Sequence, residues 1–354
     1  MAAVNVGITP LWASEIEAAP ISITKKHFPA MRHLGDITKI NGADIEPVDI
    51  ITFGSPCQDL SVAGRRAGLE GKRSVLFLQA LRVIKEMRIA TNGKYPARII
   101  WENVPGAFST RKGRDFYTVI KEICKIAEPD ISFPRLAKKW KWLASGAVLG
   151  DCWSLAWRVL DAQYFGVPQR RRRIFLVCDF GTQRAGEILF KPEGGIGDNK
   201  EIGKAGENVT GNAESGVAQR PVTYCIVGNN IDRTCKSGGN GLGVSENISY
   251  TLTSTDRHAV TVPFILGGFG DFRTGDIGGT LRAQEDSVSG DLIVSSQAVR
   301  RLTPLEYERL QGYPDGWTAY GYDGKPVSDG QRYKALGNSV AIPCVVFVLS
   351  GMKD

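Results

Sequence analysis

The sequence is poor in the residues that build metal and disulfide sites. Its three histidines do not lie near one another at the spacing of metal ligands, which argues against a zinc site or any other metal site. Its seven cysteines are scattered, odd in number and form no C-x-x-C pair. This usage argues against a disulfide framework and favours a reducing, cytoplasmic setting.

Long apolar runs are also lacking. No stretch approaches the roughly 20 apolar residues of a membrane span, and the first residues do not have the basic-then-apolar layout of a signal peptide. The chain has 354 residues, 42% of them hydrophobic and 23% charged, which is typical of a soluble globular protein without a membrane partner. This length favours one large domain with a smaller one.

The net charge of +7 is unevenly distributed. Residues 135–173 carry nine Lys or Arg against two Asp or Glu, whereas residues 181–298 carry ten basic against fourteen acidic residues. A basic segment is consistent with a polyanionic partner, because neutralising phosphates drives nonspecific affinity for nucleic acid. Many soluble proteins are equally basic, so charge alone leaves the partner open.

Hydrophobic periodicity predicts alternating strands and helices through the first 180 residues. Strands are expected at residues 9–13, 49–53, 97–101 and 174–178, and helices at residues 21–27, 74–88 and 115–127, with an irregular segment at 129–150. Such alternation predicts an α/β fold with a doubly wound, mostly parallel sheet, similar to a Rossmann fold. Sheets of this class bind their ligands where the strands end.

Chemically useful side chains follow three of these strands. Glu15, Cys57 and Glu102 each lie just beyond a predicted strand. The cysteine is a nucleophile if nearby cations lower the pKa of its thiol, and is otherwise a buried packing residue. A carboxylate at the end of a strand commonly grips ribose hydroxyls, but a solvated helix N-terminus is an equally good interpretation of Glu15.

Four consecutive arginines, Arg170 to Arg173, precede the predicted strand at residues 174–178. Such a run is usually a solvated patch. Because side chains alternate along a strand, however, Arg171 and Arg173 share a face, so two guanidinium groups could reach one site.

The composition changes near residue 181. Residues 181–298 hold 21 of the 41 glycines and several short β-like segments, which predict a second, smaller domain of strands and loops. Residues 299–354 return to the first domain, which spans residues 1–180. Thr303-Pro-Leu-Glu306 predicts a capped helix start, and a last apolar helix is expected at residues 345–349.

Five motifs, taken in order and spacing, resemble the DNA (cytosine-5-) methyltransferases, most closely the bacterial and phage type. The motifs are Pro56-Cys57-Gln58, Glu102-Asn103-Val104, Gln169-x-Arg171-x-Arg173, Arg301-Leu-Thr-Pro-x-Glu306-x-x-Arg309-Leu-Gln-Gly-Tyr-Pro-Asp315 and Gly337-Asn338-Ser339-Val340. The resemblance covers nearly the whole chain, and only residues 181–298 belong to the part that varies within the family.

The resemblance implies transfer of a methyl group from S-adenosylmethionine to carbon 5 of a cytosine flipped out of duplex DNA. Cys57 would add to carbon 6 of the ring, Glu102 would supply an acid at ring nitrogen 3, and Asn103 would hold the loop. Arg171 and Arg173 would stabilise the carbonyl oxygen of the base and the nearby carboxylate, and would keep the thiolate anionic.

The resemblance also implies a cofactor pocket and a role for each domain. The pocket would be lined by Glu15, Asp36, Ile37, Pro56, Leu76, Asn338, Ser339 and Val340, of which Ile37, Leu76 and Val340 fit equally well as ordinary core residues. Residues 181–298 would recognise the target through the major groove, and residues 135–173 would hold the DNA backbone. The expected setting is restriction–modification, with a cognate restriction endonuclease as a further partner, or phage self-protection.

One feature departs from the family. Its members open with an apolar strand and a Phe-x-Gly-x-Gly loop that cradles the methionine part of the cofactor, whereas residues 1–7 here run straight into the strand at residues 9–13. Without that central strand, strand edges and half of the cofactor pocket would be left open. The hypotheses that compete with an active enzyme are a truncated, inactive DNA-binding relic and a family member acting on RNA.

Overall fold

The computed structural model describes residues 1–54, 75–133, 141–191, 224–227, 244–253, 258–261, 265–266, 272–273 and 300–353. Pro56 and Cys57 lie outside these ranges. The first half of the described chain contains α1 (Ala2–Asn5), β1 (Trp12–Ala13), α2 (Ala18–His27), β2 (Arg32–His33), η1 (Ile37–Lys39), β3 (Ile50–Gly54), α3 (Val75–Ala90), β4 (Arg98–Asn103), η3 (Pro105–Phe108), η4 (Thr110–Gly113) and α4 (Arg114–Ala127).

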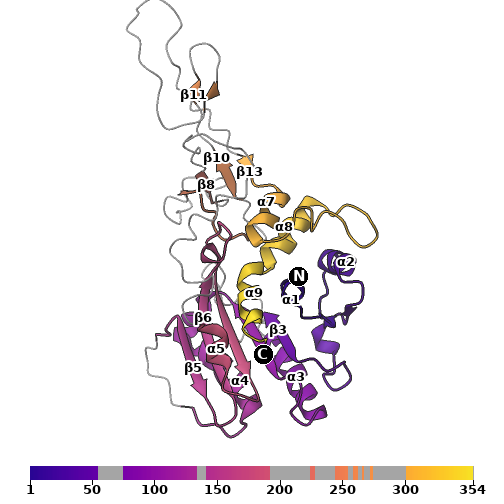
Figure 1. Ribbon diagram of the computed structural model, residues 1–354, viewed down its shortest axis with the longest axis vertical. Coiled ribbons are helices and arrows are strands. Elements are labelled where there is room, and N and C mark those ends of the chain that lie inside the picture. Colours follow the sequence, from indigo (N-terminus) through magenta and orange to yellow (C-terminus); the bar gives the residue numbers. More distant parts are fainter. Residues whose placement is uncertain are drawn as a thin grey trace, which may run out of the picture.

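The second half contributes most of the strands (Figure 1). Its elements are β5 (Ser145–Leu149), β6 (Ser154–Asp161), η5 (Ala162–Tyr164), β7 (Arg172–Asp179), α5 (Ala185–Leu189), β8 (Tyr224–Ile226), β9 (Val244–Glu246), β10 (Ala259–Thr261), β11 (Ile265–Leu266), β12 (Phe272–Arg273), β13 (Arg300–Arg301), α7 (Pro304–Gln311), α8 (Asp329–Asn338) and α9 (Ile342–Ser350). Strand β5 shows that the expectation of an irregular segment at residues 129–150 was wrong at its end.

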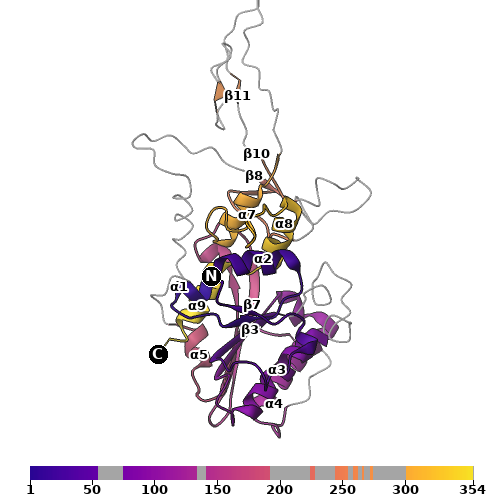
Figure 2. The same cartoon turned by 90° about the vertical axis from the view of Figure 1, so that its right-hand side faces the viewer.

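The main sheet has the strand order β3-β4-β7-β6-β5 and helices on both faces, so the predicted α/β class is confirmed (Figure 2). The sheet is more mixed than expected. Strands β3 and β4 are parallel and joined through α3, whereas β4·β7, β7·β6 and β6·β5 are antiparallel. Parallel strands need a long crossover, and the short connections between β5, β6 and β7 leave no room for one.

Each face of the sheet has its own hydrophobic cluster. Helices α3 and α4 cover one face through fully buried side chains at helical spacing, among them Phe77, Ile84, Phe116 and Ile123. Helices α1, α5 and α9 supply the other cluster. On the α3/α4 face, aromatic rings connect the end of β3 to the end of β4, from Phe53 through Phe77 to Trp101. This packing holds the two parallel strand ends side by side.

Strand β3 is an edge of the main sheet in the described part of the chain, and β1 and β2 form a separate two-stranded parallel sheet. The Asp49 carbonyl accepts a hydrogen bond from the Arg98 N–H at 3.0 Å. By the alternation of a parallel ladder, the polar backbone groups of Ile50, Thr52 and Gly54 therefore point away from β4. No described strand pairs with that edge.

Residues on both sides of the expected boundary near residue 298 share one small sheet. Its order is β13-β10-β8-β9, so Arg300 and Arg301 pair with Val260 and Ala259. The predicted helix start at Thr303 is confirmed, since Thr303 and Glu306 form a reciprocal capping box. The C-terminal segment thereby connects this small sheet to α7, α8 and α9.

Residues 329–350 are long and apolar enough, by composition, to pass as a membrane span. The backbone is extended at Ser339 and Ala341, which separates α8 from α9. Helix α9 buries Ile342, Val348 and Leu349 against the sheet. These contacts are those of a core helix.

Gly146 provides a direct test of how tightly the outer strands pack. It lies opposite Trp157, and a Cβ atom there would come within 2.2 Å of the indole ring. We expect Gly146→Ala to lower the free energy of unfolding by about 1–3 kcal/mol, because the ring has to shift. A Cβ at helical Gly330 would meet nothing within 4 Å, so Gly330→Ala is the matched control and should stabilise by about 0.4–1 kcal/mol. Urea unfolding of both variants would decide, and equal midpoints would contradict this packing.

Candidate active site

Glu102 lies at the carboxyl end of β4, where the structure brings three sequence-predicted features together. Its carboxylate Oε1 is 3.0 Å from Nε of Arg173, and the Glu102 side chain is 20% exposed. Gly54, at the end of β3, is the register partner of Glu102. A Cβ at Gly54 would lie 3.5 Å from Oε2 of Glu102. In the sequence, Cys57 follows Gly54 by three positions.

The surroundings of Glu102 favour its protonated form. Burial raises the pKa of this carboxyl, and the charges of Arg173 and Arg171 oppose the shift without cancelling it. Glu102 therefore keeps its proton to higher pH than an ordinary glutamic acid does. A carboxylic acid of this kind, hydrogen-bonded to a guanidinium group and open on one side, is suited to general acid chemistry.

Asn103 is buried directly behind Glu102. Its Oδ1 accepts a hydrogen bond from the Val104 N–H at 2.8 Å, at the point where β4 leads into η3. An amide side chain bound to the first residue of the loop restricts the direction in which the loop leaves the strand. The geometry is compatible with the predicted loop-holding role.

The two predicted arginines contact different groups. Arg173 pairs with Glu102, whereas the side chain of Arg171 is buried and donates to three backbone carbonyls. These acceptors are Leu252 at 3.0 Å, Gly337 at 3.2 Å and Ser339. Arg171 thus influences Glu102 through its charge, while its hydrogen bonds to these three carbonyls connect distant segments of the chain.

The carboxylates predicted to bind cofactor lie at the ends of β1 and β2. Oγ of Ser14 donates to the Gly35 carbonyl at 2.7 Å, which ties these ends together. Glu15 follows β1 and accepts two N–H groups of its own turn through Oε1. Asp36 accepts the backbone N–H and the hydroxyl of Thr38, and these bonds lower the pKa of Asp36 and keep it ionised.

The remaining predicted cofactor residues that the structure describes lie in or next to η1, α3 and α8. Ile37 begins η1, and its carbonyl accepts a hydrogen bond from Arg82 of α3 at 3.0 Å. Leu76 and Val340 are half-buried, so neither is a fully enclosed core residue, and Asn338 is exposed at the end of α8. An ion pair of 2.8 Å between Lys334 and Glu17 links α8 to the start of α2.

The donor set fits the adenosine half of S-adenosylmethionine. Two carboxylates at adjacent strand ends suit ribose hydroxyls and an adenine amine, and half-buried apolar side chains suit the adenine ring. The structure describes no glycine-rich turn beside β3 that would hold the amino-acid end. In the described ranges, no group of three His, Cys, Asp or Glu side chains forms a metal site.

Two residues near this site were not predicted from the sequence. Tyr313 is hydrogen-bonded to the Ser339 side chain, and burial raises the pKa of its phenol. Asp161 accepts the Arg171 N–H at 3.1 Å and so fixes the backbone at Arg171. Tyr313 could have been found because it lies inside one of the five motifs. Asp161 could have been found because it precedes the run of four arginines.

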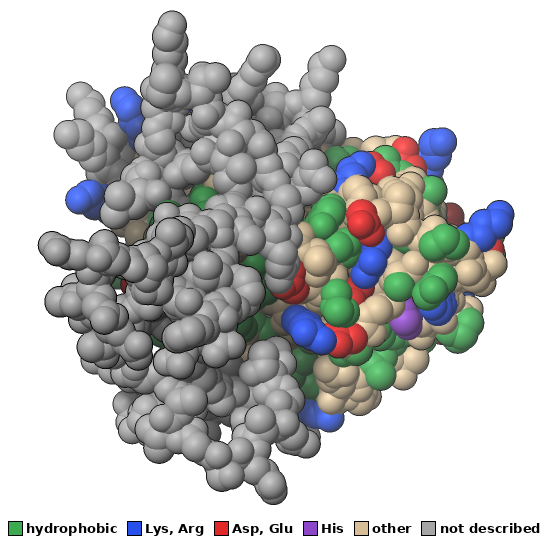
Figure 3. All heavy atoms as spheres, turned by 90° about the horizontal axis from the view of Figure 1, so that it is seen from above, with side chains coloured by type: hydrophobic (Ala, Val, Ile, Leu, Met, Phe, Trp, Pro, Cys, Tyr) green, Lys and Arg blue, Asp and Glu red, His purple; other side chains and the backbone are tan. Residues whose placement is uncertain are grey.

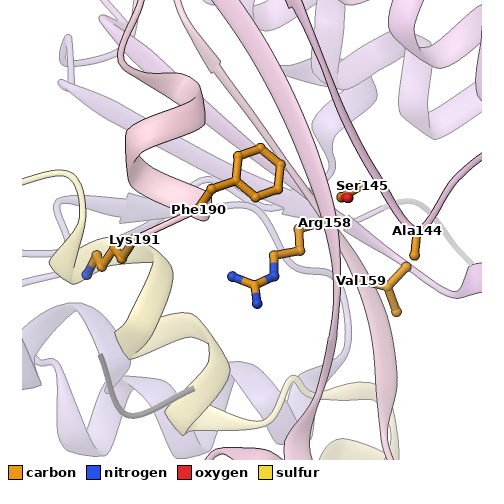
Figure 4. Close-up of a pocket in the computed structure, with 6 residues that line it drawn as sticks. All are labelled: Ala144, Ser145, Arg158, Val159, Phe190 and Lys191. Atoms are coloured by element: carbon orange, nitrogen blue, oxygen red, sulfur yellow. The ribbon is translucent and has the colours of Figure 1, made fainter. Parts of the chain in front are cut away.

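A separate hollow of about 330 Å³ lies at the outer part of the sheet (Figure 4). Its lining residues are Ala144, Ser145, Arg158, Val159, Phe190 and Lys191. Arg158 donates to the Leu189 carbonyl at 2.9 Å and Lys191 to the Phe347 carbonyl at 3.2 Å. Both cations are thus engaged in holding α5 and α9, and the hollow is not part of the Glu102 site.

Solved structures of low identity share the fold. Dnmt2 methyltransferase of S. pombe superposes with a TM-score of 0.54 at 15% identity, covering 99% of this chain and 93% of that chain. The Entamoeba histolytica methyltransferase EhMeth gives a TM-score of 0.51 at 18% identity, covering 98% and 91%. At these identities the similarities show that this chain shares the fold of the two methyltransferases.

Curated proteins are similar over nearly all of this chain. DNA N-6-adenine-methyltransferase of Escherichia phage P1 is 29% identical, covering 97% of this chain and 58% of that protein. Type II methyltransferase M.HpaII of Haemophilus parainfluenzae is 28% identical, covering 96% and 82%. M1.ScrFI of Lactococcus lactis subsp. cremoris is 26% identical, covering 98% and 72%. The chain therefore spans less than two thirds of the phage P1 protein.

The family model for C-5 cytosine-specific DNA methylases matches residues 1–127 and 141–354. This match includes the strand ends that carry Glu15, Glu102 and Arg173, together with the C-terminal segment through Val340. The resemblance seen in the motifs is confirmed, and the chain belongs to the family of C-5 cytosine-specific DNA methylases.

Proposed function

We propose that this chain transfers a methyl group from S-adenosylmethionine to carbon 5 of cytosine in duplex DNA, with Cys57 as the nucleophile. The observation that carries the proposal is the largely buried Glu102, held by Arg173 and adjacent to the strand end that leads to Cys57. A cysteine, a protonated carboxyl and a guanidinium group are the three groups that activation of a cytosine ring requires.

The proposed chemistry begins with the sulfur of Cys57. Its thiolate forms a bond to carbon 6 of the ring, and Glu102 gives its proton to ring nitrogen 3, which neutralises the developing charge. Carbon 5 becomes nucleophilic and takes up the methyl group. A base then removes the proton from carbon 5, the carbon–sulfur bond breaks, and nitrogen 3 returns its proton to Glu102. Arg173 holds the Glu102 carboxyl in place throughout.

S-adenosylmethionine, when bound, supplies the electrophilic methyl group. Glu15 and Asp36 would hold its ribose and adenine, with Ile37, Leu76 and the segment Asn338 to Val340 around them. The hydrogen bond from Ser14 to the Gly35 carbonyl supports this assignment, because it fixes the two carboxylate-bearing turns against each other. Pro56 would complete the pocket from outside the described residues.

The proposed substrate is double-stranded DNA, from which the target cytosine is flipped, because a stacked base cannot expose both faces of its ring. Figure 3 shows basic side chains scattered among acidic and hydrophobic ones on the described part of the upper face. Such a surface does not identify DNA by its charge, so the family carries this part of the proposal. Type II relatives support a role in restriction–modification. A cognate restriction endonuclease and a cytoplasmic compartment are part of this proposal.

An inactive DNA-binding relic is the second candidate, and one observation favours it. Strand β3 has no described partner on its outer edge. Such a chain would bind DNA without transferring a methyl group. Action on RNA is less well supported, because the matched relatives named for DNA or Type II methylation cover nearly the whole chain.

The test is to incubate the 354-residue chain with methyl-labelled S-adenosylmethionine and unmodified genomic DNA, digest the DNA and separate the nucleosides. We expect the label in 5-methylcytosine. Label in N6-methyladenine would overturn the cytosine assignment, and this outcome is informative because one relative carries an adenine name. DNA binding without any label would favour the relic, and label in RNA alone would favour the third hypothesis.

A further inference from the structure

We propose that Arg171 is a positioning residue that couples target recognition to cofactor binding, and not a residue that contacts the base. The inference rests on the proposed function and adds to it. It divides the paired arginines by role, with Arg173 assigned to the catalytic acid and Arg171 to a junction between two binding sites.

The side chain of Arg171 connects two segments of different predicted function. One Nη atom donates to the Leu252 carbonyl, in the segment expected to recognise the target. The other donates to the carbonyls of Gly337 and Ser339, in the segment expected to close the cofactor pocket. Leu252 is 81 positions after Arg171 and Gly337 is 166 positions after it, so this guanidinium group joins parts that are far apart in sequence.

The junction is fixed on the main sheet. Asp161 accepts the Arg171 N–H, and the Arg171 carbonyl accepts the Ala162 N–H at 3.1 Å. The backbone of Arg171 is therefore held on both sides while its side chain reaches outward. A movement of either attached segment is therefore transmitted to the guanidinium group and not to the backbone of Arg171.

Packing around the junction links the same two segments. Leu252 and Leu336 belong to one buried cluster, together with Leu302, Tyr307 and Tyr333. Leu336 directly precedes Gly337, and Leu252 provides the other carbonyl, so the hydrogen bonds and the apolar contacts act on the same pair of segments. Residues 249–251 are further attached to the sheet through backbone bonds from Arg170 and Ser249.

A shared buried donor makes the two segments interdependent. Hydrogen bonds from a charged group are among the stronger ones in a protein, and leaving a buried partner unsatisfied is costly. When DNA fixes the segment around Leu252, the guanidinium group is held in the position that also fixes Ser339. Cofactor binding then loses less conformational entropy, because the segment around Ser339 is already ordered. The coupling is reciprocal, so a bound cofactor should strengthen DNA binding by the same factor.

The experiment measures this coupling as a ratio of dissociation constants. The affinity for S-adenosylhomocysteine is determined by calorimetry, with and without a pool of 40-base-pair duplexes of randomised sequence. We expect DNA to tighten the wild-type affinity by at least about fivefold, and Arg171→Lys to bring the ratio to about one. Lysine keeps the charge, but its single ammonium group cannot reproduce a planar fork that serves three carbonyls. If Arg171 had a merely structural role, its replacement would weaken both affinities by the same factor, and their ratio would stay at the wild-type value.

Arg170→Lys is the matched control, because Arg170 bonds residues 249–251 through its backbone, and its ratio should stay at the wild-type value. The inference would be overturned if DNA left the affinity of the wild type unchanged, or if Arg171→Lys kept the same ratio of affinities as the wild type. Either result would leave the proposed function standing. Failure to bind either ligand would overturn the proposed function as well. If Arg171→Lys does not fold, hydrogen exchange of residues 337–340 in the wild type decides: slower exchange with DNA supports the coupling, and unchanged exchange overturns it.

Discussion

Replacing Cys57 with alanine is expected to abolish methyl transfer, lowering the rate by at least about 10⁴-fold. Without the sulfur no bond forms at carbon 6, and carbon 5 of the ring stays too weak a nucleophile to accept the methyl group. The position of Gly54 beside Glu102 is the structural reason for assigning this role to the thiol that follows it. Label incorporation into genomic DNA measures the loss.

Cys344 is the matched control, because the charges of Glu102, Arg171 and Arg173 act on its thiol. Burial raises the pKa of Cys344 to about 12, with Asp161 and Glu102 acting in the same direction and Arg171 and Arg173 against it. At pH 7 only about one such thiol in 10⁵ is ionised. Cys344→Ala should therefore retain methyl transfer.

Covalent capture separates the two thiols directly. Duplex DNA that contains 5-fluorocytosine cannot lose a proton from carbon 5 after methylation, so the carbon–sulfur bond should persist and retard the protein on a denaturing gel. The retarded band should form with Cys344→Ala and not with Cys57→Ala. The opposite pattern would assign the nucleophile to Cys344 and remove the argument from the strand end.

The parts of the fold that follow from local periodicity were predictable. Helix α4 (Arg114–Ala127) repeats buried residues at helical spacing, and β7 (Arg172–Asp179) contains the unbroken apolar run of residues 174–178. Helix α8 (Asp329–Asn338) was missed because glycines at 330 and 337 and many polar residues conceal it. Strand β5 (Ser145–Leu149) was missed because it is an exposed edge whose Gly146 makes room for Trp157.

The candidate site was likewise predictable from the sequence only in part. Glu102 and Arg173 were predictable as partners, because strand alternation and strand ends fix where their side chains go. The bonds from Arg171 to Leu252 and Gly337 were not, since no local pattern indicates which carbonyls a buried guanidinium group will find across 81 or 166 positions. Contacts of this kind depend on how domains close on each other, which periodicity does not encode.

Replacing Glu102 with glutamine is expected to lower kcat by about 10²–10⁴-fold. Glutamine keeps the size of the side chain and a hydrogen bond to Arg173, but has no proton of comparable acidity to give to ring nitrogen 3. Glu122→Gln, at a half-buried glutamate of α4 that pairs with Lys125, is the matched control and its kcat should be unchanged. An unchanged kcat in Glu102→Gln would show that the acid is elsewhere.

The role of Glu102 as an acid also predicts how the rate of methyl transfer depends on pH. Burial raises the pKa of Glu102, so its acid form persists above the usual range and is lost as the pH rises further. The wild-type rate should therefore fall on the alkaline side, where Glu102 loses its proton. In Glu102→Gln this alkaline fall should disappear. Rates under single-turnover conditions, between about pH 6 and about pH 9, would show this directly.

The same shift predicts an opposite effect on stability. Because the pKa of Glu102 is higher in the folded than in the unfolded chain, its contribution to stability is present below the unfolded value and lost as the pH rises through the folded value. Above that point the folded protein carries a charge that burial disfavours, and Glu102→Gln removes it. The variant should therefore resist urea better than the wild type at alkaline pH and not at acid pH. A glutamic acid that costs stability where it is ionised, and whose loss costs activity, is maintained for its chemistry.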